Sequence, residues 1–385
     1  MTKLEKLIEE LCPNGVEYQT IYEVVGVNRG KRLTKRELSD DAEYEVYHGS
    51  KDSILGKYYK YNAPANTTIV VNTGGIGGVK FLDKPFWCSD GSFWLGQAEN
   101  VDNKYIYYCL SGYEDYFYSQ KRVGGVPTID RDVVGNFKIP VPPIEVQSEI
   151  VRILDNFTEL TTELTTELTA RKKQYEYYRD ELFNLECEVV PITTIAHTYI
   201  GLVTTMTKHY VPEGVALIHN SSVKENRFEF KEKTYLDEKF AIKNNSRRHK
   251  VNDIITVHTG DVGTSAIIGE ELDGSLGFAT IVSRIHDTSL VLPKYLCYYL
   301  NSNRNKQNIV RMIKGDRNNL NLKDFNRLTI PVPPLKEQKR IVDILDRFDT
   351  LCHDISNGLP AEIEARQKQY EYYRDKLLTF KEKEI

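Results

Sequence analysis

Apolar side chains recur with a helical period along a stretch near the middle of the chain. From Ile150 through Leu154 to Leu185 they step mostly by three and four residues, which places them on one stripe of a helix. No Gly or Pro falls between Pro143 and Val190. The pattern therefore predicts a single helix of about 42 residues, roughly 60 Å long at about 1.5 Å per residue. A helix of this length with a narrow apolar stripe needs a partner helix to cover that stripe.

A second stretch repeats the first and supplies this partner. IPVPP begins at Ile139 and again at Ile330, and the motifs ILD-x-F and QYEYYRD follow it in both places. The paired prolines suit the first turn of a helix, where a missing N–H costs nothing. Asn357-Gly358-Leu359-Pro360 interrupts the second copy, so the second helix is expected to bend or split there. The distance between the starts of the two copies exceeds the roughly 20–50 residues of a solenoid repeat. The chain is therefore expected to contain two copies of a whole domain with its helix.

Short runs rich in Tyr, Val and Ile, separated by Gly and Asn, precede each helical stretch and predict strands joined by turns. In the first globular segment, Tyr44–Tyr47 and Thr68–Val71 are expected strands, and Thr20–Val27 is a helix or turn. Leu4–Leu11 is expected to form a short amphipathic helix, and Tyr105–Leu110 to begin an aromatic helix that leads to Gln120-Lys121-Arg122.

The second globular segment, Cys187 to Ile330, follows the same plan with other residues. In both segments an apolar strand runs into the motif T-G-x-x-G, so Thr73 corresponds to Thr259. The motif matches neither a Walker loop nor a dinucleotide-binding loop, so we interpret it as a tight turn between strands that places polar residues on a surface. One scaffold with two sets of surface loops suits the reading of two different sites.

Composition narrows the class of protein. A chain of 385 residues with 40% hydrophobic and 11% aromatic residues suits two or three folded domains and is not disordered. The net charge of −4 argues against a chain that wraps DNA by charge alone, but it is compatible with local basic faces. The six cysteines lack metal-binding spacing, and no apolar run approaches the length of a membrane helix. We expect a soluble cytoplasmic protein with reduced thiols and no membrane segment.

The sequence carries no catalytic motif that we recognise. IPVPP lacks the Asn or Asp with which the Asn/Asp-Pro-Pro-aromatic loop of adenine methyltransferases holds the adenine amino group. The eight histidines form no HExxH or triad pattern. Paired carboxylates with a nearby Lys would indicate a nuclease centre, and we find no such motif in the sequence. We therefore expect no catalytic residue, no metal site and no bound cofactor in this chain.

The order of these parts resembles that of the specificity subunit of type I restriction-modification enzymes. A variable region precedes a PxPPxxxQ helix that ends in RKKQYEYYRD, and a second variable region precedes a helix that ends in RQKQYEYYRD. The resemblance covers essentially the whole chain. The TTEL repeat at Thr161–Leu164 and Thr165–Leu168 is similar to the tetrapeptide repeat found at this place in one branch of that family.

The resemblance implies an α/β fold with a pseudo-twofold internal repeat. Two α/β target-recognition domains are then separated by a pair of long antiparallel helices that form a coiled-coil spacer. Residues 1–142 would be the first recognition domain with a short N-terminal helix, 143–186 the first spacer helix, 187–333 the second recognition domain and 334–385 the second spacer helix.

The resemblance further implies a non-catalytic subunit that recognises a split target in double-stranded DNA, one half with each domain. Its implied partners are two methyltransferase subunits and, for cleavage, restriction/translocase subunits. S-adenosylmethionine, ATP and Mg²⁺ are then expected on those partners, and no cofactor is expected on this chain.

Basic residues interleaved with amides and hydroxyls are the candidates for DNA contact, because Arg pairs with guanine and Asn with adenine in the major groove. The main clusters are Lys121-Arg122 and the segments 244–250 and 314–319. For each single residue, a solvated loop charge remains the alternative. The DNA-binding candidates are Arg29, Lys31, Lys51, Asn72, Thr73, Lys121, Arg122, Asn220, Ser221, Lys224, Arg247, Arg248, His258, Thr259, Lys314, Arg317 and Asn318.

Tyrosines near the end of each helical stretch are amphipathic anchors of the kind found between helices or subunits. The neighbouring Arg171-Lys172-Lys173 is interpreted as a solvated face or a protein-docking patch. The candidates for subunit docking are Tyr175, Tyr178, Arg179, Tyr370, Tyr373 and Arg374.

Another class of function stays open beside DNA recognition. A duplicated-domain structural adaptor would bind two non-DNA ligands, protein or carbohydrate, across a helical spacer. Binding to heparin with steep salt dependence distinguishes the two, because an adaptor should lack it. A self-sufficient enzyme would require a cofactor or metal motif, which we do not find.

Overall fold

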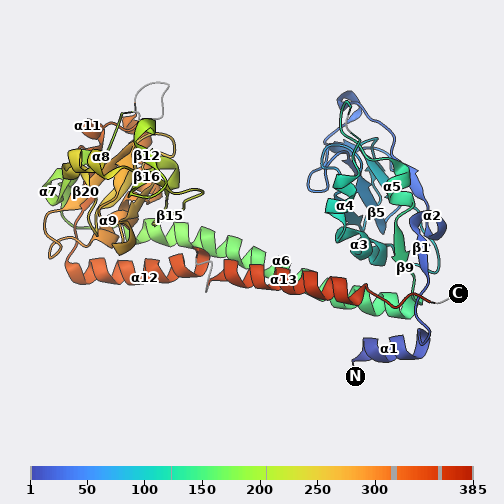
Figure 1. Cartoon of the computed structure of the whole chain (residues 1–385). Coiled ribbons are helices and arrows are strands. Elements are labelled where there is room, and N and C mark those ends of the chain that lie inside the picture. The colour runs from blue at the N-terminus through green and yellow to red at the C-terminus, as the bar shows by residue number, and fades with distance from the viewer. Residues whose placement is uncertain (1, 123, 205, 314–318, 354–357, 384–385) are drawn as a thin grey trace. The chain divides into compact units, whose positions relative to one another are not determined.

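The computed structural model describes residues 2–122, 124–204, 206–313, 319–353 and 358–383. The chain forms two compact units: the first combines residues 1–165 with 362–385, and the second comprises residues 166–361 (Figure 1). Helix α6 (Ile144–Leu182) runs without a break from the first unit into the second, as its apolar period predicts. The domain bounds expected from the sequence, which give each long helix a part of its own, stay a prediction.

The first unit has a four-stranded antiparallel sheet in the order β2 (Val27–Arg29), β8 (Ser92–Leu95), β5 (Thr67–Val71), β6 (Val79–Leu82). A three-stranded sheet has the order β4 (Gly56–Tyr58), β3 (Tyr44–Tyr47), β7 (Trp87–Cys88), and β1 (Tyr18–Thr20) pairs with β9 (Lys138–Pro140). Its helices are α1 (Lys3–Leu11), α2 (Ile21–Val24), η1 (Lys35–Glu37), α3 (Asn103–Ser111), α4 (Glu114–Ser119), α5 (Arg131–Gly135), the start of α6 and most of α13 (Leu359–Leu377).

The second unit has one four-stranded sheet in the order β11 (Ala196–Ile200), β20 (Thr280–Ile285), β17 (Ile254–Val257), β18 (Ser265–Ile267). Another has the order β12 (Tyr210–Val211), β16 (Thr234–Leu236), β13 (Val215–His219), β19 (Leu276–Phe278). The two-stranded pairs are β10 (Val189–Pro191) with β21 (Thr329–Pro331) and β14 (Val223–Lys224) with β15 (Arg227–Phe228).

The helices of the second unit are short, apart from the end of α6 and helix α12 (Leu335–His353). They are α7 (Ile192–Ile195), η2 (Thr207–His209), η3 (Asn220–Ser222), α8 (Glu238–Lys243), η4 (Asn245–Arg247), η5 (Glu270–Leu272), α9 (Pro293–Leu300), α10 (Asn303–Met312) and α11 (Leu322–Phe325). In the part of the chain that is described, no helix has the length and apolar character needed to cross a membrane.

One strand order occurs in both units, which confirms the shared fold predicted from the repeat. The order β2-β8-β5-β6 in the first unit matches β11-β20-β17-β18 in the second. The pairs β3–β7 and β13–β19 are also both parallel, in sheets that are otherwise antiparallel. Every residue of β5 and β17 is buried, as expected for the continuous apolar runs of central strands.

The T-G-x-x-G motif forms the same tight turn in both units, between β5 and β6 and between β17 and β18. The amide of Val71 donates to the carbonyl of Gly78, and that of Val257 to the carbonyl of Thr264, both at 2.8 Å. The two glycines of the motif have φ angles of 78° and 86° in the first unit and 99° and 89° in the second. Only Gly adopts such angles without strain, so the motif is a turn, as interpreted from the sequence.

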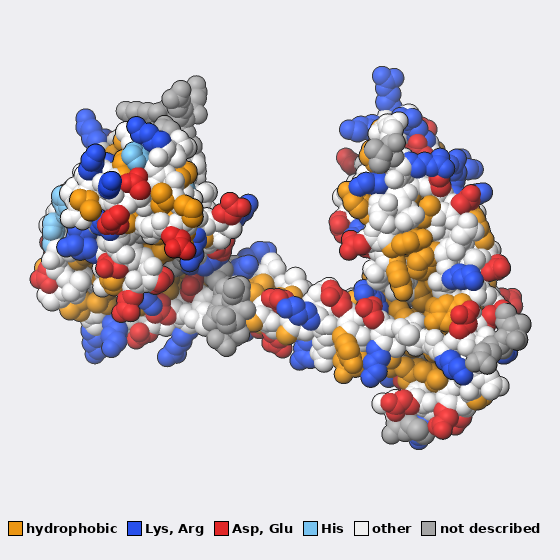
Figure 2. Space-filling view, viewed as in Figure 1, with side chains coloured by type: hydrophobic (Ala, Val, Ile, Leu, Met, Phe, Trp, Pro, Cys, Tyr) orange, Lys and Arg blue, Asp and Glu red, His pale blue; other side chains and the backbone are white. Residues whose placement is uncertain are grey.

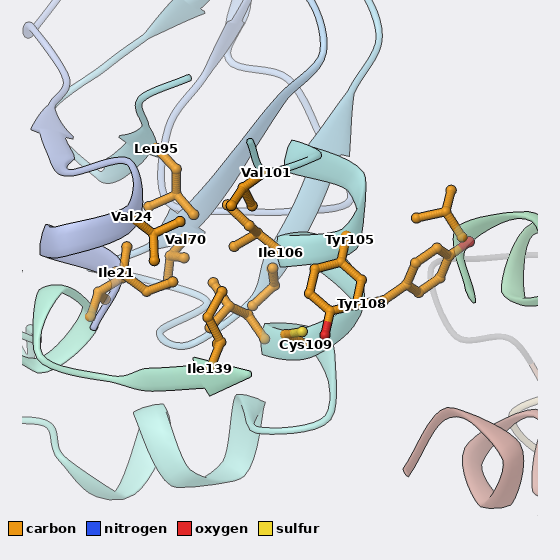
Figure 3. Packing of buried hydrophobic residues seen from close by; sticks show 14 of the residues in the cluster. Ile21, Val24, Val70, Leu95, Val101, Tyr105, Ile106, Tyr108, Cys109 and Ile139 are labelled. Atoms are coloured by element: carbon orange, nitrogen blue, oxygen red, sulfur yellow. The ribbon is translucent and has the colours of Figure 1, made fainter. Parts of the chain in front are cut away.

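The hydrophobic core of the first unit lies between its central sheet and helix α3 (Figure 3). Val70 and Leu95 of the sheet belong to one buried cluster with Tyr105 and Ile106 of α3. In the second unit α9, with Tyr295, takes the place of α3 in a core of its own. The aromatic helix predicted at Tyr105–Leu110 is therefore a core element.

A buried glutamine in the PxPPxxxQ motif fixes the start of each long helix to its globular part. The Gln147 amide donates to the carbonyls of Pro142 at 2.7 Å and Asn100 at 3.1 Å, and its oxygen accepts from the amide of Asp102 at 3.0 Å. Gln338 makes the matching three bonds at 2.8 to 2.9 Å. Both glutamine side chains are fully buried, and each binds three backbone groups of its own unit.

Replacing Gln147 with Leu is expected to lower the free energy of unfolding of the first unit by about 2–4 kcal/mol, because three backbone groups lose their hydrogen-bond partner. Urea denaturation followed by circular dichroism measures this change. Replacing the exposed Gln120 with Leu is the matched control and should change stability by less than about 0.5 kcal/mol. A Gln147 variant as stable as the control would contradict the anchoring role.

A half-buried aspartate, eight residues after each glutamine, makes a further contact between the long helix and the globular part. Asp155 of α6 accepts from Tyr108 of α3 at 2.5 Å and from Lys104 at 2.7 Å. Asp346 of α12 accepts from the matching Tyr and Lys of α9, each at 2.7 Å. The repeated ILD-x-F motif thus supplies the second fixed point between helix and globular part.

Within each unit the long helices run antiparallel (Figure 1). Phe157 of α6 stacks on Tyr373 of α13 with ring centroids 5.4 Å apart, and Phe348 of α12 stacks on Tyr178 of α6 at 5.8 Å. The same two positions of the repeat therefore make the same contact in both units.

The second helical copy is divided, as the Asn357-Gly358-Leu359-Pro360 segment predicts. Helix α12 ends at His353 and α13 begins at Leu359. Residues 354–357 lie outside the described part of the chain.

The C-terminal segment completes the first unit. The amide of Val16 donates to the carbonyl of Lys381 at 2.8 Å, and the amide of Lys383 donates back to Val16 at 3.0 Å. Leu377 and Phe380 pack against the core of this unit. The first unit is therefore assembled from two segments that are far apart in the sequence.

Candidate nucleic-acid interface

Backbone hydrogen bonds join several loops of the first unit where β5 ends. The amide of Lys31 donates to Cys88 at 2.8 Å, that of Asn72 to Gly91 at 3.1 Å, and that of Ile129 to Asn72 at 3.0 Å. We call the joined residues the first loop edge: 29–32, 72–75, 88–92, 120–122 and 124–130.

Most DNA-binding candidates of the first unit lie on the first loop edge. The Lys and Arg residues among them differ in the contacts that they make within the protein. Arg29 and Lys31 are exposed. Arg122 pairs with Asp130 but keeps 73% of its side chain exposed. Lys121 lies 3.5 Å above the ring of Tyr118. Figure 2 shows Lys and Arg side chains gathered at the end of this unit that lies away from α6.

Asn72, Thr73 and Lys51 use their side chains within the protein. Asn72 donates to the carbonyl of Asp90 at 3.3 Å, and Thr73 donates to that of Pro127 at 3.2 Å. Lys51 binds both carboxylate oxygens of Glu114 at 2.6 and 2.7 Å. These three residues shape the loops, and a direct contact to DNA stays a prediction for them.

A second loop edge is built in the same way where β17 ends. The amide of Leu320 donates to His258 at 2.9 Å, and the amide of His258 donates to Ala279 at 3.3 Å. The Asn220 side chain donates to the carbonyl of Thr259 at 2.6 Å. The second loop edge consists of residues 219–222, 258–261, 278–280 and 319–320.

The two loop edges share one junction. Thr73 forms an isolated bridge with Thr128, and Thr259 forms the equivalent bridge with Asn319. The correspondence of Thr73 with Thr259 predicted from the sequence is therefore confirmed by the same pairing in both units. The residues that flank the junction differ, with Asn72 in the first unit and His258 in the second.

The basic segment 244–250 is held to the protein more closely than its composition suggests. Arg247 donates to the carbonyl of Gly201 at 2.8 Å, and Arg248 pairs with Glu238 at 2.6 Å. Burial lowers the pKa of His249 to about 4, so this histidine is neutral near pH 7. The local positive charge therefore comes from the two arginines and Lys250, and their contact to DNA stays a prediction.

The remaining DNA candidates lie apart or outside the described residues. Ser221 is exposed on the second loop edge. Lys224 lies on β14, in the hairpin whose Glu225 contacts α6. Three candidates fall in the segment that the structure does not describe: Lys314, Arg317 and Asn318.

Two of the predicted docking residues are core residues instead. Tyr175 and Arg179 are only 2% and 1% exposed, because the end of α6 packs inside the second unit. Tyr178 is exposed by 42%, and Tyr370, Tyr373 and Arg374 are half-buried in the first unit. A contact of these four residues with a partner subunit stays a prediction.

Sequence reasoning did not identify the anchoring roles of Gln147 and Asp155, or of Glu225 as the partner of Arg179. The first two carried a usable signal, because each residue recurs at the same place in both copies of the repeat. Glu225 lies in a loop without a counterpart, so no pattern marks it. In the described ranges, the structure shows no group of three or more His, Cys, Asp or Glu side chains suited to a metal ion.

Comparisons with known proteins agree on one family. The model of the type I restriction modification DNA specificity domain matches twice, at residues 13–173 and 205–365. A putative type I restriction enzyme specificity subunit of Haemophilus influenzae is 30% identical over 98% of both chains. The specificity subunit of the type I restriction enzyme EcoR124I/EcoR124II from Escherichia coli is 35% identical over 72% of this chain and 70% of its own.

Solved structures show the same fold. The S subunit of a type I restriction-modification system from M. genitalium superposes with a TM-score of 0.60 at 18% identity, covering 94% of this chain and 96% of its own. A chain from a study of complex assembly and conformational transition in the type I R-M system superposes with a TM-score of 0.65 at 15% identity, covering 95% and 98%.

Proposed function

Because this chain belongs to the family of type I restriction-modification DNA specificity subunits, we propose that it selects the DNA target of such a system by reading a split site. Each unit reads one half of the site in double-stranded DNA through its loop edge. Two methyltransferase subunits join the chain for modification, and restriction/translocase subunits join for cleavage.

The observation that carries this proposal is the duplicated junction with different residues around it. The backbone bond from Ile129 to Asn72 has its counterpart in the bond from Leu320 to His258, at 3.0 and 2.9 Å. A shared scaffold holds both loop edges in the same way, while the side chains that a ligand would meet differ. Such a design suits two half-sites of different sequence.

The proposal assigns recognition to this chain and catalysis to its partners. S-adenosylmethionine, ATP and Mg²⁺ belong to the methyltransferase and restriction subunits, and this chain binds no cofactor. The TTEL run sets the distance between the half-sites. The complex acts on DNA in the cytoplasm.

The test compares the purified chain with its complex. Alone, the chain is expected to bind DNA with an affinity that falls steeply with salt, because phosphate contacts release counterions. It should transfer no methyl group from S-adenosylmethionine. With the methyltransferase subunit added, radiolabelled methyl groups should appear in DNA that carries one split sequence. Methyl transfer by the chain alone, or a complex that methylates without sequence preference, would refute the proposal.

A further inference from the structure

Arg179 and Arg374 occupy the same place in the two QYEYYRD motifs, but among the described residues only Arg179 pairs with a carboxylate from another element. Its side chain is buried and donates to Glu225 of the β14–β15 hairpin at 2.7 Å. Lys306 of α10 reaches the other oxygen of Glu225 at 2.5 Å. Although burial opposes it, the two cations lower the pKa of Glu225. A buried guanidinium is thus neutralised inside the second unit.

Arg374 keeps the aromatic part of this arrangement and lacks the buried acid. Its guanidinium lies over the ring of Tyr370 at 5.8 Å, as that of Arg179 lies over Tyr175 at 5.1 Å. In the described part of the chain its ion pair is with the adjacent Asp375, at 2.8 Å, whose side chain is 69% exposed. A pair so open to solvent contributes little, although the Arg374 side chain itself is only 14% exposed.

A pocket of about 240 Å³ opens beside Arg374 in the first unit, between α3, β9 and α13. Tyr108, Tyr113 and Phe137 line its wall, and Lys138 adds a second cation to the lining. The lining of the pocket therefore combines aromatic side chains with two positive charges and one negative charge, that of Asp375. This chemistry suits a carboxylate carried on an apolar stem.

Exposed tyrosines lie at α4, which follows the pocket-lining residue Tyr113 in the chain. Tyr113, Tyr116 and Tyr118, at α4, are 51%, 45% and 51% exposed, and the first two pack against Phe137 with ring centroids 4.9 and 5.6 Å away. Hydrophobic side chains gather on the visible face of this unit (Figure 2). Helix α10, at the equivalent place in the second unit, carries Asn, Arg, Lys and Gln instead. Tyr and Arg are the residues that concentrate binding energy in protein interfaces, so the surface suits a polypeptide.

We propose that this pocket receives an aspartate or glutamate side chain of the methyltransferase subunit, which pairs with Arg374 as Glu225 pairs with Arg179. That the partner is the methyltransferase subunit rests on the proposed function. That its contacting residue is acidic rests on the comparison of Arg374 with Arg179 in the two QYEYYRD motifs. The second unit carries its own acid for this position, and the first unit takes the acid from its partner.

The experiment measures the affinity of the full chain for its methyltransferase subunit by titration calorimetry. Arg374→Glu is expected to weaken binding by about tenfold or more, because a desolvated charge pair becomes a repulsion. Arg374→Gln should lie between this variant and the natural chain. Lys368→Glu, on the same helix, is the matched control: its side chain is 72% exposed and pairs with Glu364, and binding should remain within about twofold.

A charge exchange identifies the acid and shows that Arg374→Glu is folded. Each Asp and Glu of the methyltransferase subunit is replaced by Arg in turn, and one replacement should restore binding to Arg374→Glu while weakening binding to the natural chain. Undiminished binding by Arg374→Glu, or a loss that no replacement restores, overturns the proposal. Failure of the proposed function is distinct, because the natural chain would then bind neither the methyltransferase subunit nor a split site.

Discussion

Exchange of Cys187–Ile330 for the corresponding segment of another specificity subunit is expected to change one half of the recognised DNA sequence and to leave the other half unaltered. The physical reason is that each loop edge is held by hydrogen bonds within its own unit, over a core of its own. Gln338 and Asp346 of α12 bind the second globular part as Gln147 and Asp155 of α6 bind the first. Because this junction is the same in both copies, a related segment can form it with α12.

Sequencing of methylated adenines in cells that carry the exchanged chain measures both halves at once. The reciprocal control exchanges residues 16–140, which should alter the other half alone. The modular reading fails if either exchange changes both halves, or if neither changes any.

Insertion of one further TTEL unit after Leu168 is expected to lengthen the unspecified gap between the half-sites by one or two base pairs. Four residues add about 6 Å to α6 at roughly 1.5 Å each, while stacked base pairs rise about 3.4 Å. The hydroxyls of Thr161 and Thr162 donate to the carbonyls four residues earlier, at 2.9 and 2.8 Å, so these threonines are accommodated within the helix. Leu recurs every four residues, so the apolar stripe continues through the insertion.

The measurement maps methylated sites for the inserted chain, and a deletion of one unit should shorten the gap in turn. A matched control replaces Thr161 and Thr162 with Ala, which keeps the length of α6 and should keep the gap. Half-site sequences should stay fixed throughout. An unchanged gap after insertion would show that the TTEL run is only a tolerant surface of the helix.

The features that the sequence predicted well have local or repeated causes. The length of α6 follows from its apolar period, the division of the second helical copy from Gly358 and Pro360, and β5 and β17 from continuous apolar runs. The aromatic helix after Tyr105 was predicted less fully: it ends at Ser111, with Gly112 as its C-cap, and α4 begins at Glu114.

The environments of individual side chains could not be predicted, because they depend on distant residues. Arg179 and Arg374 stand in identical heptapeptides, yet one is buried by a hairpin that has Glu225 at its tip and the other borders a pocket. Arg247 and Arg248 likewise looked free in the sequence and are held by Gly201 and Glu238. For the DNA candidates the sequence therefore indicates the loops, and the structure shows which side chains already have partners.

The division of the first unit into two segments reverses the usual order of folding on the ribosome. Domains generally fold as they emerge, the N-terminal one first. Here residues 166–361 form a continuous unit that is complete before residues 362–385 have been made. Tyr370 and Phe380, which pack against the core of the first unit, leave the exit tunnel after the whole of the second unit. A nascent chain therefore carries a finished second unit while its first unit still exposes part of its core, and a chain truncated before residue 362 would keep that exposure permanently.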